Sequence, residues 1–214
     1  MDVDVVLPCL DEAAALPGVL GALPTGYRAI VVDNGSTDGS PEVAAAHGAK
    51  VVHEQVRGYG AAVHTGLEHA TAEVVCFLDA DGSLDPGELP RLVALLDGTQ
   101  LAVGKRVPVG RGAWPWHARA GNAVLAALLR RRGLPVTDIA PARAVRRADL
   151  LALGVRDRAF GYPLELLIRA AEAGWSVAEI PVAYRPRAAG TRSKVSGSVR
   201  GTLRAVRDMA GVLR

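Results

Sequence analysis

Two aspartates one residue apart, Asp79 and Asp81, carry the clearest chemical signal in the sequence. They follow the apolar run 74–78, which is typical of a buried strand, and they precede Gly82 and Ser83. Residues i and i+2 of an extended segment point to the same side, so both carboxylates can reach one divalent cation, whose preferred ligands are oxygens. A metal held there could bind a diphosphate. The same residues are also typical of an ordinary turn, because Asp bonds its own backbone and Gly accepts a positive φ.

The elements that would position these carboxylates alternate along the first half of the chain. Runs rich in Val and Ile predict strands, and Ala- and Leu-rich stretches between them predict helices, which is the pattern of a parallel sheet with crossover helices. Ser40 and Pro41 predict the N-cap and first residue of a helix that continues over 42–47, and Asp85-Pro86 predicts a similar start. The predicted strands are residues 3–8, 29–33, 50–53, 74–79 and 101–105.

Acidic loops follow three of these predicted strands. They comprise Asp11 and Glu12, the segment 33–39, and the segment 79–83. In an open α/β sheet the ligand lies beyond the carboxyl ends of the strands. Clustered carboxylates repel one another unless a cation or hydrogen bonds compensate. The sequence therefore predicts a ligand site at this edge of the sheet.

The second half of the chain is less regular. We expect a helix over 114–132, a strand over 137–146 that leads into a helix over 147–153, a helix over 162–174, a strand over 177–184 and a basic loop over 185–193. No internal repeat or low-complexity linker is present, so a boundary near residue 106 would divide one fold rather than two domains. The 214 residues are expected to form a single domain, with halves 1–106 and 107–195 and a terminal helix 196–214.

Composition argues against several classes of protein. The net charge of +3 suits a small anionic ligand, while the aromatic content of 4% and the lack of a basic stripe argue against a nucleic-acid reader. Cys9 and Cys76 lie in apolar segments, which predicts buried thiols in a reducing compartment. No signal-like segment and no uncharged stretch of ~20 residues is found, which predicts a cytoplasmic protein.

The order and spacing of several motifs together resemble the family 2 glycosyltransferases, particularly the dolichyl-phosphate mannosyltransferases and the bacterial polyprenyl-phosphate glycosyltransferases. The resemblance implies a GT-A fold, in which a Rossmann-like, mostly parallel sheet is flanked by helices. It also implies a UDP- or GDP-linked sugar donor, Mg²⁺ or Mn²⁺, and inversion at the anomeric carbon. The motifs are VLPCLDE (6–12), VVDNGSTDG (31–39), RGYGAA (57–62), FLDADGS (77–83), GKR (104–106), Thr137-Asp138, EIPV (179–182) and the basic segment 187–194.

The resemblance assigns roles to residues of the first half. Asp79 and Asp81 match the metal-binding pair, with Asp81 the expected direct ligand and Ser83 a further oxygen, and the metal would neutralise charge on the leaving diphosphate. Asp33 matches the acidic residue that contacts the base or ribose, whereas Asn34 stands where the family usually has a second Asp. The donor-binding residues so implied are Pro8, Leu10, Glu12, Asp33, Gly35, Arg57, Gly58, Asp79, Ala80 and Asp81.

Two acceptor classes remain open at this point. A hydroxyl acceptor needs a general base, and Glu165, at the start of a predicted helix, is the candidate; the alternative is a Glu that simply favours the positive end of the helix dipole. A phosphate monoester is already anionic and needs no base, but it needs convergent basic groups. The acceptor-binding residues that match the polyprenyl-phosphate branch are Arg106, Arg119, Arg187, Ser193 and Lys194.

The C-terminal segment also permits two interpretations. An amphipathic helix there could attach peripherally to anionic lipid at the inner face of the plasma membrane, or it could pack on the domain with its arginines in solvent. The region Ala140-Pro141 departs from the Gly and aromatic residue common in relatives, which puts the shape of the acceptor pocket in doubt. The apolar positions of the helix are Val199, Leu203, Val206, Ala210 and Leu213, and the basic ones are Arg200, Arg204 and Arg207.

Two other functions are weighed against the transferase. A sugar-phosphate nucleotidyltransferase would carry a Gly-rich basic loop after the first strand, where this chain has Cys-Leu-Asp-Glu-Ala over 9–13. A non-catalytic nucleotide-sugar-binding or membrane-associated module would have no need to retain Asp79 and Asp81. The sequence does not determine the base, the sugar, the acceptor or the oligomeric state.

Overall fold

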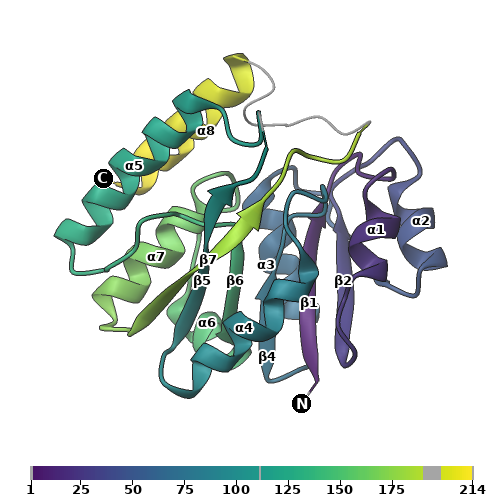
Figure 1. The fold of residues 1–214 in the computed structure, drawn as a ribbon, viewed down its shortest axis with the longest axis horizontal. Helices are drawn as coiled ribbons and strands as arrows, with labels where there is room; N and C mark the ends of the chain where they lie inside the picture. Colours follow the sequence, from purple (N-terminus) through teal and green to yellow (C-terminus); the bar gives the residue numbers. More distant parts are fainter. Residues whose placement is uncertain (1, 111, 190–198, 214) are drawn as a thin grey trace.

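A seven-stranded sheet crosses the molecule in the order β3-β2-β1-β4-β6-β5-β7 (Figure 1). The computed structural model describes residues 2–110, 112–189 and 199–213. Neighbouring strands are parallel except for β6, which is antiparallel to both β4 and β5, so the predicted mostly parallel sheet is confirmed. The strands are β1 (Val3–Cys9), β2 (Tyr27–Asp33), β3 (Lys50–His53), β4 (Val74–Phe77), β5 (Leu101–Pro108), β6 (Ala142–Arg146) and β7 (Val177–Tyr184).

Helices cover both faces of the sheet because successive strand side chains point to opposite sides. Val6 and Val32 face a core shared with α3, α5, α6 and α7, while Val5 and Val31 face a second core shared with α1, α2 and α4. The helices are α1 (Leu16–Gly21), α2 (Ser40–Ala46), α3 (Tyr59–His69), α4 (Leu89–Ala94), α5 (Trp116–Arg131), α6 (Arg147–Leu153), α7 (Tyr162–Glu172) and α8 (Val199–Val212), with short 3₁₀ turns at Pro86–Glu88 and Leu95–Asp97.

Most predicted elements are found with ends that differ by a few residues, and two predictions need correction. Ser40 is not the N-cap of α2: Gly39 holds that position with φ 84°, and the Ser40 hydroxyl instead accepts a hydrogen bond from the Glu12 amide at 2.9 Å. The strand predicted over 137–146 begins only at Ala142. Residues 137 and 138 leave the sheet because their amides donate to the carboxylate of Glu179.

The two predicted halves of the chain share one sheet. Residue 106 lies inside β5, whose eight residues all pair with β7, so no element ends at the predicted boundary. The helix predicted in segment 196–214 is α8, and it packs against α7. Within the described ranges, no helix has the length and apolar character needed to cross a membrane.

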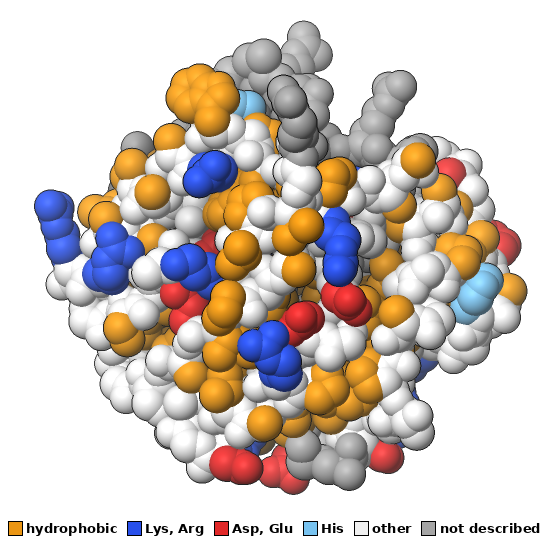
Figure 2. Space-filling view, in the orientation of Figure 1, with side chains coloured by type: hydrophobic (Ala, Val, Ile, Leu, Met, Phe, Trp, Pro, Cys, Tyr) orange, Lys and Arg blue, Asp and Glu red, His pale blue; other side chains and the backbone are white. Residues whose placement is uncertain are grey.

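Surface charge and the two thiols agree with the composition. Over the face seen in Figure 2, Lys and Arg side chains are interspersed with acidic and hydrophobic ones rather than gathered together. Cys9 and Cys76 are both free and buried, as predicted. Burial raises the pKa of the Cys9 thiol to about 11, so this thiol stays protonated at neutral pH.

Candidate active site

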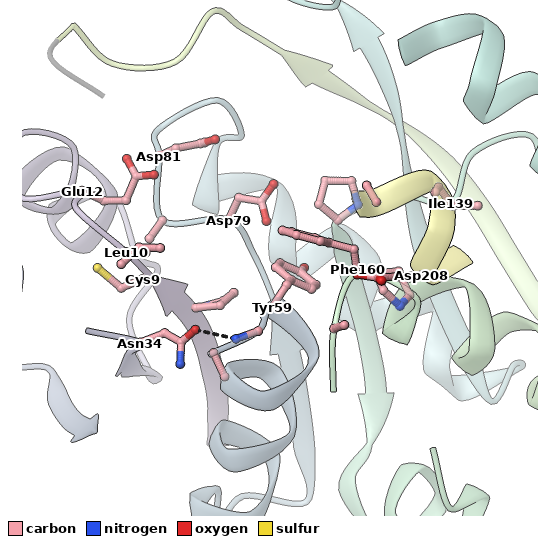
Figure 3. A pocket seen from close by; sticks show the side chains of 18 of the residues that line it. Cys9, Leu10, Glu12, Asn34, Tyr59, Asp79, Asp81, Ile139, Phe160 and Asp208 are labelled. Carbon is pink, nitrogen blue, oxygen red and sulfur yellow. Dashed lines mark hydrogen bonds between the residues drawn. The ribbon is translucent and has the colours of Figure 1, made fainter. Parts of the chain in front are cut away.

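A cavity of about 430 Å³ opens where the carboxyl ends of β1, β2 and β4 meet (Figure 3). Such a volume is typical of small-molecule sites. One wall consists of the loops after β1 and β4, Asn34, and the start of α3. The opposite wall consists of the segments 139–141 and 159–163 together with α8. The site therefore lies at the sheet edge that the acidic loops predicted.

Eight of the ten predicted donor-binding residues line this cavity, namely Pro8, Leu10, Glu12, Arg57, Gly58, Asp79, Ala80 and Asp81. Asp33 and Gly35 do not. The buried Asp33 carboxylate accepts hydrogen bonds from the amides of Gly35 at 3.3 Å and Ser36 at 3.0 Å. Burial alone would raise the pKa of Asp33, but these bonds and those from the side chains of Ser36 and His53 lower it. Asp33 thus holds the turn that follows β2.

Asp79, Asp81 and Ser83 fit the oxygen ligands of a divalent cation. Oδ2 of Asp81 and Oγ of Ser83 are buried and form no hydrogen bond of good geometry among the described residues, although Oδ2 of Asp81 is in an ion pair with Arg187. Burial, followed by repulsion from Asp81, raises the pKa of Asp79, so the ionised Asp79 carboxylate favours a nearby positive charge. The described residues contain no group of three His, Cys, Asp or Glu side chains that would hold a metal by itself. An ion here would complete its coordination with substrate oxygens, as Mg²⁺ commonly does.

Three arginines line the same cavity, Arg57, Arg106 and Arg187. Nη1 of Arg187 lies 2.8 Å from Oδ2 of Asp81 and 3.5 Å from Oε1 of Glu12. The Arg187 loop is joined to the aspartate loop by two backbone bonds, from the amide of residue 185 to the carbonyl of residue 83 and from that of 188 to that of 81. Of the other predicted acceptor residues, Arg119 is exposed and does not line the cavity, and Ser193 and Lys194 lie outside the described residues.

Arg106 is held rigidly by its neighbours. Its Nε and Nη2 donate to the two oxygens of the buried Asp138 at 3.0 and 2.7 Å, and its guanidinium lies 4.0 Å from the ring centre of Trp114 and 5.5 Å from that of Tyr184. The amide of Asp138 in turn donates to Glu179 at 3.0 Å. The motifs at 137–138 and 179 therefore fix the direction in which Arg106 faces, a role that the sequence did not reveal.

Asn34 has a role that a second Asp could not fill. Its Nδ2 donates to the carbonyls of Glu54 at 2.9 Å and Val56 at 2.8 Å, and its Oδ1 accepts from the amide of Gly58 at 2.8 Å (Figure 3). A carboxylate cannot donate the first two bonds. The three bonds position the loop that carries Arg57. The sequence shows that residue 34 is an asparagine, but only the folded chain shows which backbone groups its amide contacts.

The structure does not bring Glu165, the candidate base, to the cavity. Its carboxylate accepts hydrogen bonds from the amides of Arg156 and Asp157, at 3.0 and 2.5 Å, and pairs with Nε of Arg169 at 2.6 Å. Burial alone would raise the pKa of Glu165, but these bonds lower it, which weakens it as a base. Glu165 also lies in the first turn of α7. The position therefore favours the structural interpretation, and the catalytic role is not supported.

Sequence reasoning missed the wall of the cavity farther from β1. Ile139, Phe160, Asp208 and Met209 line it, the last two from α8, and Tyr59 at the start of α3 lines the cavity next to Phe160 (Figure 3). Ile139, Phe160 and Met209 are apolar and lie in none of the motifs, so they give no local signal of a binding site, whereas Tyr59 lies inside the motif at 57–62. The contact favours a packed terminal helix, although the side chains of 199–204 and 206 lie outside the described ones.

Comparison with known proteins identifies the family. Residues 4–153, more than half of the chain, match the family model described as glycosyl transferase family 2. The chain belongs to glycosyl transferase family 2. It is 57% identical, over 213 residues, to an uncharacterized glycosyltransferase of Mycobacterium tuberculosis H37Rv, an alignment that covers 99% of this chain and 97% of the relative. The predicted family and enzyme class are therefore confirmed.

Two further comparisons concern glycosyltransferases with named activities. The polyprenol monophosphomannose synthase of Mycolicibacterium smegmatis is 35% identical over 219 residues, which cover 91% of this chain and 81% of the relative. The crystal structure of glucosyl-3-phosphoglycerate synthase from Mycobacterium tuberculosis in complex with Mn²⁺, UDP and glucosyl-3-phosphoglycerate superposes with a TM-score of 0.77 at 26% identity, covering 99% of this chain and 78% of that one. The predicted GT-A fold of this glycosyltransferase is thereby confirmed.

Proposed function

We propose that this glycosyltransferase moves a sugar from a UDP- or GDP-linked donor to a phosphate oxygen of the acceptor, in a metal-dependent reaction that inverts the anomeric carbon. The observation that carries the proposal is the meeting of three arginines with Asp79 and Asp81 in one cavity. The polyprenyl-phosphate class of acceptor is supported by the likeness to the polyprenol monophosphomannose synthase. An anionic acceptor also needs no base, in keeping with the position of Glu165 outside the cavity.

The residues divide the reaction between them. The acceptor phosphate oxygen forms a bond to the anomeric carbon while the bond from that carbon to the diphosphate breaks, and the electron pair leaves with the nucleoside diphosphate. Asp79 and Asp81 would hold a divalent metal, which neutralises the charge that develops on the leaving group. Arg106, fixed by Asp138, presents its cation to an incoming anion. Attack from the side opposite the leaving group inverts the configuration.

Calorimetry of donor binding tests the first half of the proposal. UDP-glucose and GDP-mannose are titrated with and without Mn²⁺ into the wild type, Asp81→Asn and the control Asp97→Asn, whose side chain is exposed after α4. We expect metal-dependent binding of one donor, lost in Asp81→Asn and kept in Asp97→Asn. Binding that ignores both metal and Asp81 would contradict the proposal.

An acceptor panel tests the second half. With the donor so identified, turnover is measured with a short polyprenyl phosphate and with the matching polyprenol, and the anomeric configuration of the product is read by NMR. We expect transfer to the phosphate only, with inversion. Turnover of the polyprenol would require a general base, and retention of the anomeric configuration would exclude a single displacement. Release of pyrophosphate would indicate a nucleotidyltransferase. Binding of the donor without turnover of any acceptor would indicate a non-catalytic module.

A small phosphorylated acceptor is the second candidate, because the superposed glucosyl-3-phosphoglycerate synthase holds its phosphorylated product together with UDP and Mn²⁺. The same arginines would serve such a ligand, since guanidinium groups recognise phosphate whatever carries it. Adding 3-phosphoglycerate to the acceptor panel separates the two candidates. Transfer to it in preference to the polyprenyl phosphate would favour the small acceptor.

A further inference from the structure

The cavity has a second half that the predicted donor residues do not occupy. We call it the α8 half-cavity, and we define it by Tyr59, Ile139, Phe160, Asp208 and Met209. Figure 3 shows the rings of Tyr59 and Phe160 between Asp79 on one side and Asp208 on the other. This half is continuous with the aspartate pair and lies next to it. A group bonded to a diphosphate at Asp79 and Asp81 would therefore reach it.

Asp208 is the unusual member of this half. Its side chain is 10% exposed, and its ion pair with Arg207 is long, at 3.5 Å, to a guanidinium whose own side chain is 81% exposed. No hydrogen bond to its carboxylate is found among the described residues. Asp208 is of intermediate exposure, so a ligand that closes its carboxylate off from water costs free energy unless that ligand supplies hydrogen-bond donors. The carboxylate of Asp208 can therefore accept further hydrogen bonds from a ligand next to the rings of Tyr59 and Phe160.

We propose that the α8 half-cavity is the subsite for the hexose ring of the donor, and that Asp208 accepts hydrogen bonds from its hydroxyl groups and so sets the sugar preference. This inference rests on the proposed function. A hexose has both an apolar face of C–H groups, which packs on aromatic rings, and hydroxyls that donate to a carboxylate. The subsite offers a partner to each.

The acceptor chain fits this half less well. An isoprenoid carries no donor group, so its chain would seal the Asp208 carboxylate away from water without supplying a hydrogen bond. A site built to bond a hydroxyl also rejects a ligand that lacks it, because the carboxylate is then left unsatisfied. The C-terminal helix would accordingly serve donor selection rather than acceptor binding.

Asp208 also lines a second groove, between α7 and α8, that carries both basic residues such as Arg169 and acidic ones such as Asp157. A residue that merely attached α8 to α7 would affect stability and every ligand alike. A specific subsite would affect only ligands that carry the sugar. The difference between nucleotide and nucleotide-sugar binding therefore separates the two roles.

The experiment compares UDP with UDP-glucose, and GDP with GDP-mannose, by calorimetry in Mn²⁺. The proteins are the wild type, Asp208→Asn, Phe160→Leu and the control Asp97→Asn, each with its thermal unfolding recorded. We expect Asp208→Asn to weaken binding of the nucleotide-sugar about tenfold or more, the scale of a hydrogen bond to a charged group, while the nucleotide changes less than about twofold. Phe160→Leu should act in the same direction, and the control should match the wild type.

Equal affinity of wild type and Asp208→Asn for the nucleotide-sugar would overturn the subsite, as would an equal loss for nucleotide and nucleotide-sugar. Tighter binding of a polyprenyl phosphate by Asp208→Asn, with donor binding unchanged, would assign this half to the acceptor chain and overturn it too. Failure of the wild type to bind any nucleotide would contradict the proposed function itself. If one of the two variants, Asp208→Asn or Phe160→Leu, does not fold, the other still tests the subsite. The first removes the charge that would accept bonds from the hydroxyls, and the second changes the ring that would pack on the apolar face of the sugar.

Discussion

At the scale of single residues, the contact between Arg187 and Asp81 has a direct consequence for metal binding. Nη1 of Arg187 forms an ion pair at 2.8 Å with Oδ2 of Asp81, a buried oxygen with no other bonding partner among the described residues. A guanidinium and a divalent cation repel one another at such a distance, so they compete for this oxygen. Arg187 released from Asp81 would still be held near it, because its loop is bonded to residues 81 and 83.

Replacing Arg187 should therefore strengthen metal binding. We expect Arg187→Met to raise the affinity for Mn²⁺ in the absence of nucleotide by roughly three- to tenfold, the scale of a partly exposed ion pair, as measured from the EPR signal of free Mn²⁺. The control is Arg185→Met in the same loop, whose partner is Asp85 at 3.5 Å. Unchanged or weaker Mn²⁺ binding by Arg187→Met would show that the two cations do not compete.

The Asn34 amide gives a second test at this scale. In Asn34→Asp, the carboxylate would face the carbonyls of Glu54 and Val56 with no proton to donate. We expect the free energy of unfolding in urea to fall by about 1–3 kcal/mol at neutral pH, and nucleotide binding to weaken because the loop that carries Arg57 loses its support. A variant as stable as the wild type would mean that the loop is held by other contacts.

At the scale of elements, the start of α7 shows how one carboxylate can organise a turn. Glu165 accepts bonds from the amides of residues 156 and 157, which precede the segment 159–163 on the cavity wall. Its lowered pKa means that the ionised form stabilises the folded state. This contribution is complete above the unfolded pKa of about 4.3 and is lost as the pH falls from there through the lower folded-state pKa.

Removing the charge of Glu165 should change the free energy of unfolding and its pH dependence, and should leave sugar transfer to a phosphate acceptor unchanged. We expect Glu165→Gln to lower the free energy of unfolding by about 1–3 kcal/mol at pH 7, and the difference from wild type to shrink as the pH falls below about 4. Both the loss at pH 7 and its dependence on pH are measured by urea unfolding of the variant and the wild type at several pH values. Glu172→Gln, exposed on the same helix, is the control. Loss of turnover with a phosphate acceptor at full stability would restore Glu165 as a candidate base.

At the scale of the whole molecule, the cavity joins segments from the two ends of the chain. Pro8, Cys9, Leu10 and Glu12, at and just after the end of β1, line one space with Ala205, Asp208 and Met209 of α8. A ligand held there contacts elements from both cores of the sheet. It should therefore stabilise the fold as a unit rather than one half of it, because binding to the folded state alone raises the free energy of unfolding.

Metal and donor together should raise the unfolding temperature. At a ligand concentration about a hundredfold above Kd the free energy of unfolding rises by about 2.7 kcal/mol, or roughly 5–10 °C in a domain of this size. Differential scanning fluorimetry with Mn²⁺ and the selected nucleotide-sugar measures the shift, which EDTA should abolish. Asp81→Asn should show no shift. A shift that survives EDTA would indicate donor binding without the metal.

Much of the fold and half of the site could be predicted because their signals are local. Alternating Val- and Ile-rich strands with helices determine a mostly parallel sheet, and the carboxyl ends of its strands must share an edge. Asp79, Asp81 and the loops after β1 and β2 therefore had to meet. The order and spacing of the motifs also indicated the protein family, since the main motifs follow predicted strands of the sheet.

Tertiary structure alone decided which side chains complete the site. The partner of Asp81 is an arginine 106 positions later in the sequence, Glu165 turns to a loop beside it rather than to the cavity, and Asp208 reaches the cavity from the last helix. Arg187 lies in a motif, but the sequence does not give its partner, and neither Glu165 nor Asp208 has a distinctive neighbourhood in sequence. Such contacts depend on how helices pack and loops close in three dimensions, because hydrogen bonds and burial, not local propensity, determine where a polar side chain finds its partner.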